Sequence, residues 1–170
     1  MSQSIAKKYI AEFVYGATDG TITTFAIVSG VVGASLSPAV ILLLGLSNVL
    51  ADGFSMAASN FLAKRAESGM AEGESAVSPL KSAGATFASF VSVGMIPLLP
   101  FIIAFFVSYP VEHQFLYSIL ATAVAFIFSG YFRGKVTGEN VYIAAIETLL
   151  IGGVAASIAY GVGYFLQGVV

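Results

Sequence analysis

The sequence of 170 residues contains no cysteine. Disulfide bonds, thiolate metal sites and iron–sulfur clusters are therefore excluded. Charge is scarce as well, because Asp, Glu, Lys and Arg together make up 9% of the residues, against about 25% in average globular proteins. Hydrophobic residues make up 58%. This composition argues against a soluble fold and predicts an integral membrane protein.

A helix needs about 20 mostly apolar residues to cross the hydrocarbon core of a bilayer. The N-terminal residues are polar and run straight into a long apolar segment, so we expect no cleaved signal peptide. The longest polar connection is residues 67–79, and Pro97 and Pro100 should kink the third helix. The sequence predicts an all-α fold, a single domain of five transmembrane helices at residues 12–35, 38–62, 82–109, 115–131 and 141–167.

The basic residues all fall on one side of this arrangement. They are Lys7, Lys8, Lys64, Arg65, Lys81, Arg133 and Lys135. Positively charged residues are enriched in cytoplasmic loops of membrane proteins. We therefore expect the N-terminus in the cytoplasm and the C-terminus outside.

Three carboxylates are predicted within the membrane at a similar depth. At 1.5 Å per residue, Asp19 and Asp52 lie about 24 Å and about 21 Å from the outer ends of their helices, and Glu147 lies about 9 Å from the cytoplasmic start of the last helix. An ionisable group at the bilayer centre costs at least about 2.5 kcal/mol, and such groups mark ion or proton pathways. An inert buried hydrogen bond is the weaker explanation for the two aspartates. Glu147 could instead serve the start of its own helix, and we expect Glu12 at the membrane interface.

The two aspartates belong to rows of polar residues spaced four apart, so that each row lies on one helix face. The rows are Tyr15, Asp19 and Thr23 in the first span and Asn48, Asp52, Met56 and Asn60 in the second. Carboxylate and amide oxygens beside a thioether suit a divalent transition metal, because sulfur shifts the preference toward softer ions. Each of these residues also has a purely structural explanation. A methionine on a helix face is more often packed in the core, and the two asparagines would then serve only to link helices through hydrogen bonds.

Three runs of the sequence resemble the vacuolar iron transporter family. They are DGTITTFAIVSG at residues 19–30, SNVLADGFSMA at 47–57 and AKRAE at 63–67. The resemblance implies a homodimer that moves Fe²⁺ or Mn²⁺ out of the cytoplasm in exchange for protons, with the ion path at the dimer interface between the first two helices. Asp19 and Met56 match the ligand positions within the membrane, and Glu67 matches an acidic residue at the cytoplasmic end of the second helix. The resemblance thus shifts the first-choice metal ligand from Asp52 to Asp19.

The sequence departs from the eukaryotic members of this family, which carry a Glu- and Met-rich domain between the second and third helices. Here the connection is only residues 67–79. Its Glu67, Met70, Glu72 and Glu74 form either a weak oxygen-rich collecting site or a solvated acidic turn. The chain therefore resembles the shorter prokaryotic members, and we expect it in a prokaryotic plasma membrane.

Metal binding requires deprotonated carboxylates and so releases protons. Asp19, Asp52 and Glu147 are the candidates for this coupling, with Asn48, Asn60 and Thr23 lining the path. We expect no permanently bound cofactor and no nucleic acid partner: Fe²⁺ or Mn²⁺ is the substrate, H⁺ the coupling ion, and lipid and a second copy of the chain are the partners. The choice between Fe²⁺ and Mn²⁺ stays open.

Two other functions use the same residues. A passive divalent-cation channel would need the same acidic layer but no proton gradient. An intramembrane aspartyl protease also places two aspartates in neighbouring helices, but it needs Gly-x-Gly-Asp, whereas Asp19 follows Ala-Thr and Asp52 follows Leu-Ala. We therefore expect a transporter rather than an enzyme.

Overall fold

The computed structural model describes residues 5–70, 77–107 and 110–169, and within these ranges all regular secondary structure is helical. The side chains of residues 5–8, 70, 111 and 112 lie outside the description. The elements are α1 (Ile5–Gly33), α2 (Pro38–Met70), α3 (Pro79–Gly94), the short 3₁₀ helix η1 (Ile96–Leu98), α4 (Leu99–Ala104), α5 (Val111–Thr137) and α6 (Val141–Leu166).

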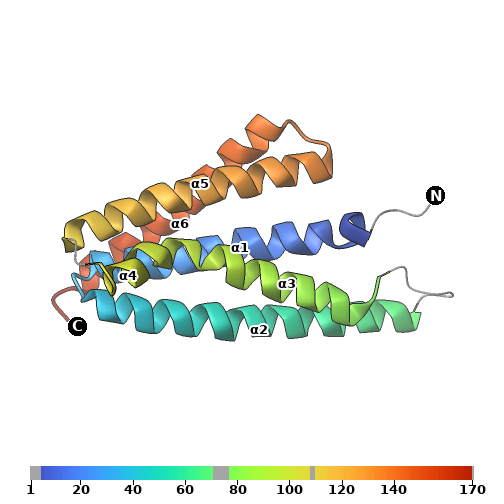
Figure 1. The fold of residues 1–170 in the computed structure, drawn as a ribbon, viewed down its shortest axis with the longest axis horizontal. Coiled ribbons are helices and arrows are strands. Elements are labelled where there is room, and N and C mark those ends of the chain that lie inside the picture. The colour runs from blue at the N-terminus through green and yellow to red at the C-terminus, as the bar shows by residue number, and fades with distance from the viewer. Residues whose placement is uncertain (1–4, 71–76, 108–109, 170) are drawn as a thin grey trace.

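The helices lie side by side along one long axis (Figure 1). The N-terminus, the α2–α3 connection and the α5–α6 turn are at one end, while the α1–α2 turn and the C-terminus are at the other. Because α3, η1 and α4 follow one another as a single broken rod, the chain traverses the bundle five times. The elements that carry the basic residues therefore all have those residues at the same end of the bundle, as the sequence predicts.

The third rod breaks near Pro97, which confirms the predicted kink. A proline has no N–H to continue the helical hydrogen bonds. The α-helix ends at Gly94, and the chain resumes as η1 and then α4. The Pro97 carbonyl, at this break, accepts a hydrogen bond of 2.7 Å from the Ser118 hydroxyl of α5. A polar side chain from a neighbouring helix thus satisfies a backbone group at the break, as the absence of water in a bilayer requires.

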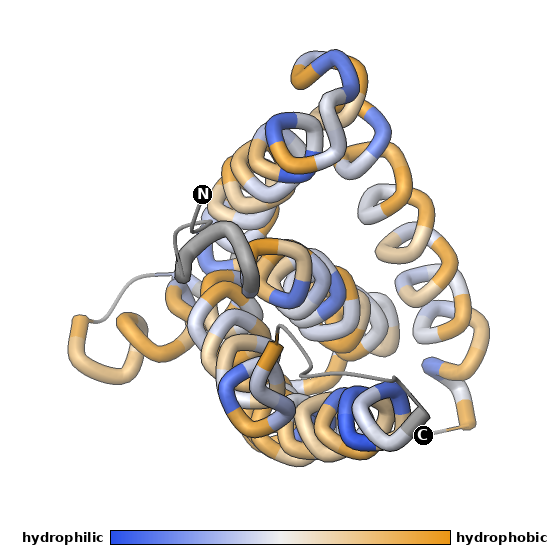
Figure 2. Tube along the Cα trace, turned by 90° about the vertical axis from the view of Figure 1, so that its right-hand side faces the viewer, coloured by the Kyte–Doolittle hydropathy of each residue, from blue (hydrophilic) through white to orange (hydrophobic). Residues whose placement is uncertain are grey.

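Four rods are long and apolar enough to cross a membrane: Pro38–Gly69, Pro79–Ala104, His113–Thr137 and Val141–Leu166. Figure 2 shows hydrophobic residues along every helix, interrupted at intervals by hydrophilic ones. Helix α1 has 29 residues, enough for a span, but among the described residues it is not one of the four. Four of the five predicted spans are supported in this way, and the first stays a prediction.

Helix α1 can be more polar than the other helices because protein surrounds much of it. It packs against α2, α3, α5 and α6, and Thr21, Thr24 and Val28 are fully buried. Hydroxyl groups at these buried positions therefore face other helices instead of hydrocarbon, whereas Tyr15 of the same helix is exposed. The outer helices show the opposite pattern, with large apolar side chains such as Phe54 and Leu150 exposed.

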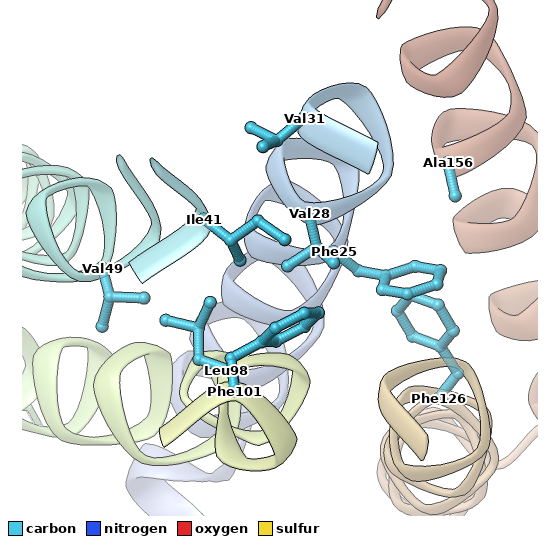
Figure 3. Packing of buried hydrophobic residues seen from close by; sticks show 9 residues of the cluster. All are labelled: Phe25, Val28, Val31, Ile41, Val49, Leu98, Phe101, Phe126 and Ala156. Atoms are coloured by element: carbon cyan, nitrogen blue, oxygen red, sulfur yellow. The ribbon is translucent and has the colours of Figure 1, made fainter. Parts of the chain in front are cut away.

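One hydrophobic cluster holds the rods together in the half of the bundle that contains the α1–α2 turn (Figure 3). Phe25, Val28 and Val31 of α1 lie at its centre, where α2, the broken third rod, α5 and α6 each contribute. The remaining members are Ile41, Val49, Leu98, Phe101, Phe126 and Ala156.

Glycines let α1 and α3 approach closely beside Asp19. A Cβ atom added at Gly20 would lie 2.6 Å from the Phe90 carbonyl oxygen, and one at Gly16 would lie 2.6 Å from the Thr86 carbonyl oxygen. Such distances are shorter than van der Waals contact, so only glycine fits. Small residues allow this backbone approach between membrane helices, and here the crossing fixes the position of α1 on both sides of Asp19.

Candidate metal-transport site

Asp19 of α1 and Asp52 of α2 lie near each other across the two helices. Both residues are partly buried. Within residues 5–70, 77–107 and 110–169, neither carboxylate has a hydrogen-bond or ion-pair partner. The helical rise per residue predicts one depth for the two residues, which requires that they lie near each other. Two neighbouring carboxylates without a donor can hold a proton or a cation between them.

An open pocket of about 360 Å³ lies between α1 and α2. Met56 and Asn60, two members of the predicted row on α2, line it together with other residues of both helices. The full lining is Tyr15, Ser55, Met56, Ser59, Asn60 and Ala63. Asp19 and Asp52 are not part of it. A thioether, an amide and hydroxyl groups thus share one pocket, and this donor set suits a borderline divalent metal.

The other two predicted path-lining residues behave differently from each other. The Thr23 hydroxyl donates to the Asp19 backbone carbonyl at 2.9 Å, one helical turn back. Its hydrogen is therefore used within the helix. Asn48 Nδ2 is buried and has no hydrogen-bond partner among the described residues, so this amide has an unused donor there.

Glu147 is not grouped with the two aspartates. Its carboxylate forms an ion pair of 2.5 Å with Arg133 of α5, and the side chain is 54% exposed. Arg133 also approaches the Ala144 carbonyl at 3.4 Å. The pair links the end of α5 to the start of α6. A role of Glu147 in proton coupling stays a prediction, and the contact that the structure provides is a link between two helices.

Glu67 lies on the last turns of α2 and not in a loop, because α2 continues to Met70. The predicted connection at residues 67–79 is therefore shorter than the sequence suggests. Glu67 Oε2 pairs with Lys64 Nζ at 3.1 Å, one turn earlier, and its side chain is 62% exposed. Such pairs support helices at their ends. Glu72 and Glu74 lie outside the described residues.

A second polar cluster was missed by the sequence reasoning. Ser82 of α3 lies 3.1 Å from Glu12 Oε1 and 2.7 Å from Asn60 Oδ1. Glu12 Oε2 is buried and has no partner among the described residues, and the position of Glu12 at the membrane interface stays a prediction. One signal was available: Glu12 precedes Asp19 by seven residues, or two turns, and so lies on the same face of α1.

A single copy of the chain offers few metal ligands. Among the described residues there is no group of three or more His, Asp or Glu side chains that could hold a metal ion. Asp19 and Asp52 supply carboxylates, and Met56 lies in the adjoining pocket. Each protomer therefore provides at most part of a coordination shell.

The sequence of this chain matches a known protein family. A sequence model of the VIT family matches residues 10–77 and 64–164. The two matches cover all six α-helices apart from a few terminal residues. They overlap at residues 64–77, where the end of α2 leads into the connection to α3.

Among curated proteins, the chain is similar to the vacuolar iron transporter of Toxoplasma gondii (26% identity over 228 aligned positions, covering 95% of this chain and 76% of the relative). Vacuolar iron transporter 1 of Oryza sativa subsp. japonica is 37% identical over 79 residues, which cover 46% of this chain and 30% of the relative. The vacuolar iron transporter of Centaurea cyanus is 24% identical, covering 92% of this chain and 87% of the relative. These relatives are named as transporters rather than enzymes.

Proposed function

This chain belongs to the VIT family, and we propose that it moves Fe²⁺ or Mn²⁺ out of the cytoplasm in exchange for protons. The chain is a membrane protein whose named relatives are iron transporters. Exchange for protons follows from the chemistry of the site, because a metal binds the deprotonated carboxylates and a proton competes with it.

The observation that carries the proposal is the pair Asp19 and Asp52. The two residues lie near each other, and neither carboxylate has a hydrogen-bond or ion-pair partner among the described residues. A charged group that is taken out of water without a compensating partner carries a desolvation cost. A cation or a proton between them offsets this cost, and the Met56 pocket offers a softer donor to an incoming metal.

The proposal includes a two-fold dimer. One protomer supplies too few ligands, and a second copy doubles each of them. The side of α2 that carries the pocket is available for this contact: Ser55 and Ser59 are exposed, and Tyr15 of α1 is 63% exposed. Exposed hydroxyl groups within a membrane span gain hydrogen-bond partners at a protein interface.

The direction of transport rests on the positive-inside rule. The end of the bundle with the N-terminus, the α2–α3 connection and the α5–α6 turn faces the cytoplasm in this proposal (Figure 1). The pocket and Glu67 then lie on the side from which metal arrives. The family members named above are vacuolar by name, whereas we propose a prokaryotic plasma membrane for this chain because of its short α2–α3 connection.

The test is metal flux in proteoliposomes that contain the purified protein. We expect Mn²⁺ and Fe²⁺ uptake to dissipate a pH gradient, recorded with a pH-sensitive dye inside the liposomes. Asp19→Asn keeps the size of the side chain and removes its charge, so it should reduce flux to the level of empty liposomes. Glu139→Gln in the exposed α5–α6 turn is the matched control and should leave flux unchanged.

The same liposomes separate exchange from a passive channel. With the membrane voltage held at zero by a potassium ionophore, a proton gradient alone should drive metal against its concentration. Flux that follows voltage and ignores the proton gradient would favour the channel. Undiminished flux in Asp19→Asn would remove Asp19 from the path.

A further inference from the structure

Glu12, Asn60 and Ser82 belong to α1, α2 and α3 and meet inside the protomer. Ser82 is fully buried. Its hydroxyl oxygen lies 3.1 Å from Glu12 Oε1 and 2.7 Å from Asn60 Oδ1, and both are hydrogen-bond distances. Ser78, at the start of α3, donates its backbone N–H to the hydroxyl of Tyr9 on α1 at 3.3 Å, which ties the two helices together nearby.

The serine has fewer hydrogens than this arrangement requires. A hydroxyl carries one hydrogen, and an ionised carboxylate and an amide oxygen only accept. Ser82 therefore cannot donate to Glu12 and to Asn60 Oδ1 at once. Either Glu12 must carry a proton, or the Asn60 amide must turn over, for Ser82 to form both hydrogen bonds.

Two arrangements satisfy all three groups. With a proton on Glu12, its carboxyl donates to Ser82 and Ser82 donates to Asn60 Oδ1. With Glu12 ionised, Ser82 donates to Glu12, and the Asn60 amide turns over so that Nδ2 donates to Ser82. The oxygen and nitrogen ends of an amide have nearly the same shape, so the turn needs little space.

The two arrangements present opposite ends of the Asn60 amide to the pocket that this residue lines together with Met56. In the first, the N–H groups face the pocket and disfavour a cation. In the second, Oδ1 faces the pocket and can bind one. We propose that Glu12 is a proton-binding site linked to the metal pocket through Ser82 and the Asn60 amide, so that a proton on Glu12 and a metal ion in the pocket exclude each other.

Glu12 has no basic partner among the described side chains. Oε2 is buried without a partner, and no ion pair to Glu12 exists among the described residues. On α2, Lys64 is paired with Glu67. On α3, Lys81 is exposed. On α1, Asp19 lies two turns away on the same face, and the side chain of Lys8 lies outside the description. The charge of Glu12 is thus not neutralised by any basic side chain that the structure describes.

This inference rests on the proposed metal transport, and the experiment separates the two. Mn²⁺ is added to purified protein in weakly buffered detergent solution, and a pH indicator counts the protons released per bound Mn²⁺. In Glu12→Gln the amide nitrogen donates to Ser82 and holds the relay as in the protonated form. We expect weaker Mn²⁺ binding and fewer protons released than by wild type.

Ser82→Ala interrupts the relay without fixing the amide. We expect Mn²⁺ binding close to wild type, again with fewer protons released. Weaker Mn²⁺ binding in Glu12→Gln but not in Ser82→Ala, with the same loss of proton release in both, distinguishes a relay from general damage to the fold. Glu139→Gln is the control with wild-type behaviour, and elution of each variant as a single species shows that it is folded.

Equal proton release by wild type, Glu12→Gln and Ser82→Ala overturns the inference. A second readout needs no metal: the infrared spectrum of the metal-free protein should contain a protonated-carboxyl band that Glu12→Gln loses and Glu139→Gln keeps. A spectrum unchanged in Glu12→Gln also overturns it. If that band is lost but wild type binds no Mn²⁺, the proposed function fails, and with it the link to the metal, while the proton site stands.

Discussion

At the scale of single residues, Thr23 and Asn48 show that polar side chains on the same predicted path have different uses. Thr23 has given its hydrogen to the backbone of its own helix, whereas Asn48 holds a buried donor with no partner. An unsatisfied buried donor costs about 1–3 kcal/mol. Asn48 is therefore the better candidate for a contact formed only with a second protomer or with a hydrated ion.

Met56→Leu tests the softness of the site. Leucine has a similar volume, and such swaps cost less than about 1.5 kcal/mol, so the fold should persist. Because the thioether favours softer ions, we expect Fe²⁺ flux to fall more than Mn²⁺ flux in a competition assay in proteoliposomes. Met95→Leu is the matched control, since Met95 packs against the hydrophobic core and should leave the ratio unchanged. If the ratio of Fe²⁺ flux to Mn²⁺ flux is unaltered in Met56→Leu, then Met56 contributes only to packing and does not bind the metal.

At the scale of helices, the position of α1 decides the site. It carries Asp19, its polar residues are enclosed by four neighbours, and glycines fix its crossing with α3. Helix α2 packs mainly on α3 and less on α1, which leaves room for the pocket between α1 and α2. The site therefore depends on how closely α1 packs against its neighbours other than α2.

Gly20→Ala should disturb this crossing. The added methyl group would lie 2.6 Å from the Phe90 carbonyl oxygen, so the backbone has to shift. Overpacking of this kind costs about 1–3 kcal/mol, and the shift displaces the neighbouring Asp19. We expect a lower melting temperature and reduced Mn²⁺ flux. Gly161→Ala, where no atom lies within 4 Å of the added carbon, is the control and should melt at or above the wild-type temperature.

The link between α5 and α6 is tested by exchanging its charges. Arg133→Glu and Glu147→Arg should each lower the melting temperature, and the double exchange should regain part of the loss. Because Glu147 is more than half exposed, the coupling energy is expected to be about 1 kcal/mol or less. A double exchange that restores stability but not proton exchange would assign Glu147 a role in coupling as well.

At the scale of the whole molecule, the bundle has its termini at opposite ends (Figure 1), and the pocket lined by Met56 and Asn60 is open to the outside. Four exposed residues of α2 lie on the same face as this pocket, at spacings of seven, four and seven residues. They are Leu44, Ala51, Ser55 and Leu62. This face is the expected contact between two protomers.

The absence of native cysteine makes this contact easy to test. Leu44→Cys and Leu62→Cys should each form a disulfide-linked dimer after mild oxidation in the membrane, seen by gel electrophoresis without reducing agent. Leu150→Cys on the exposed side of α6 is the control and should stay monomeric on the gel. Efficient linkage through residue 150 and none through α2 would contradict the proposed interface.

The sequence by itself determined the membrane class, four of the five spans and the end of the bundle that carries the basic residues. Each of these depends on hydrophobicity, on helical rise or on spacing within one helix. The break at Pro97 belongs with them, because proline acts on its own backbone.

The tertiary structure alone decided which helix is enclosed and which side chains meet across helices. Glu12, Asn60 and Ser82 are far apart in the sequence but share one cluster, and Glu147 meets Arg133 instead of the aspartates. Spacing along one helix cannot predict such contacts, because they depend on how neighbouring helices rotate and cross when their glycines and side chains pack. The same packing places Glu12, which the sequence predicts at the interface, in contact with Ser82, which also contacts the pocket residue Asn60.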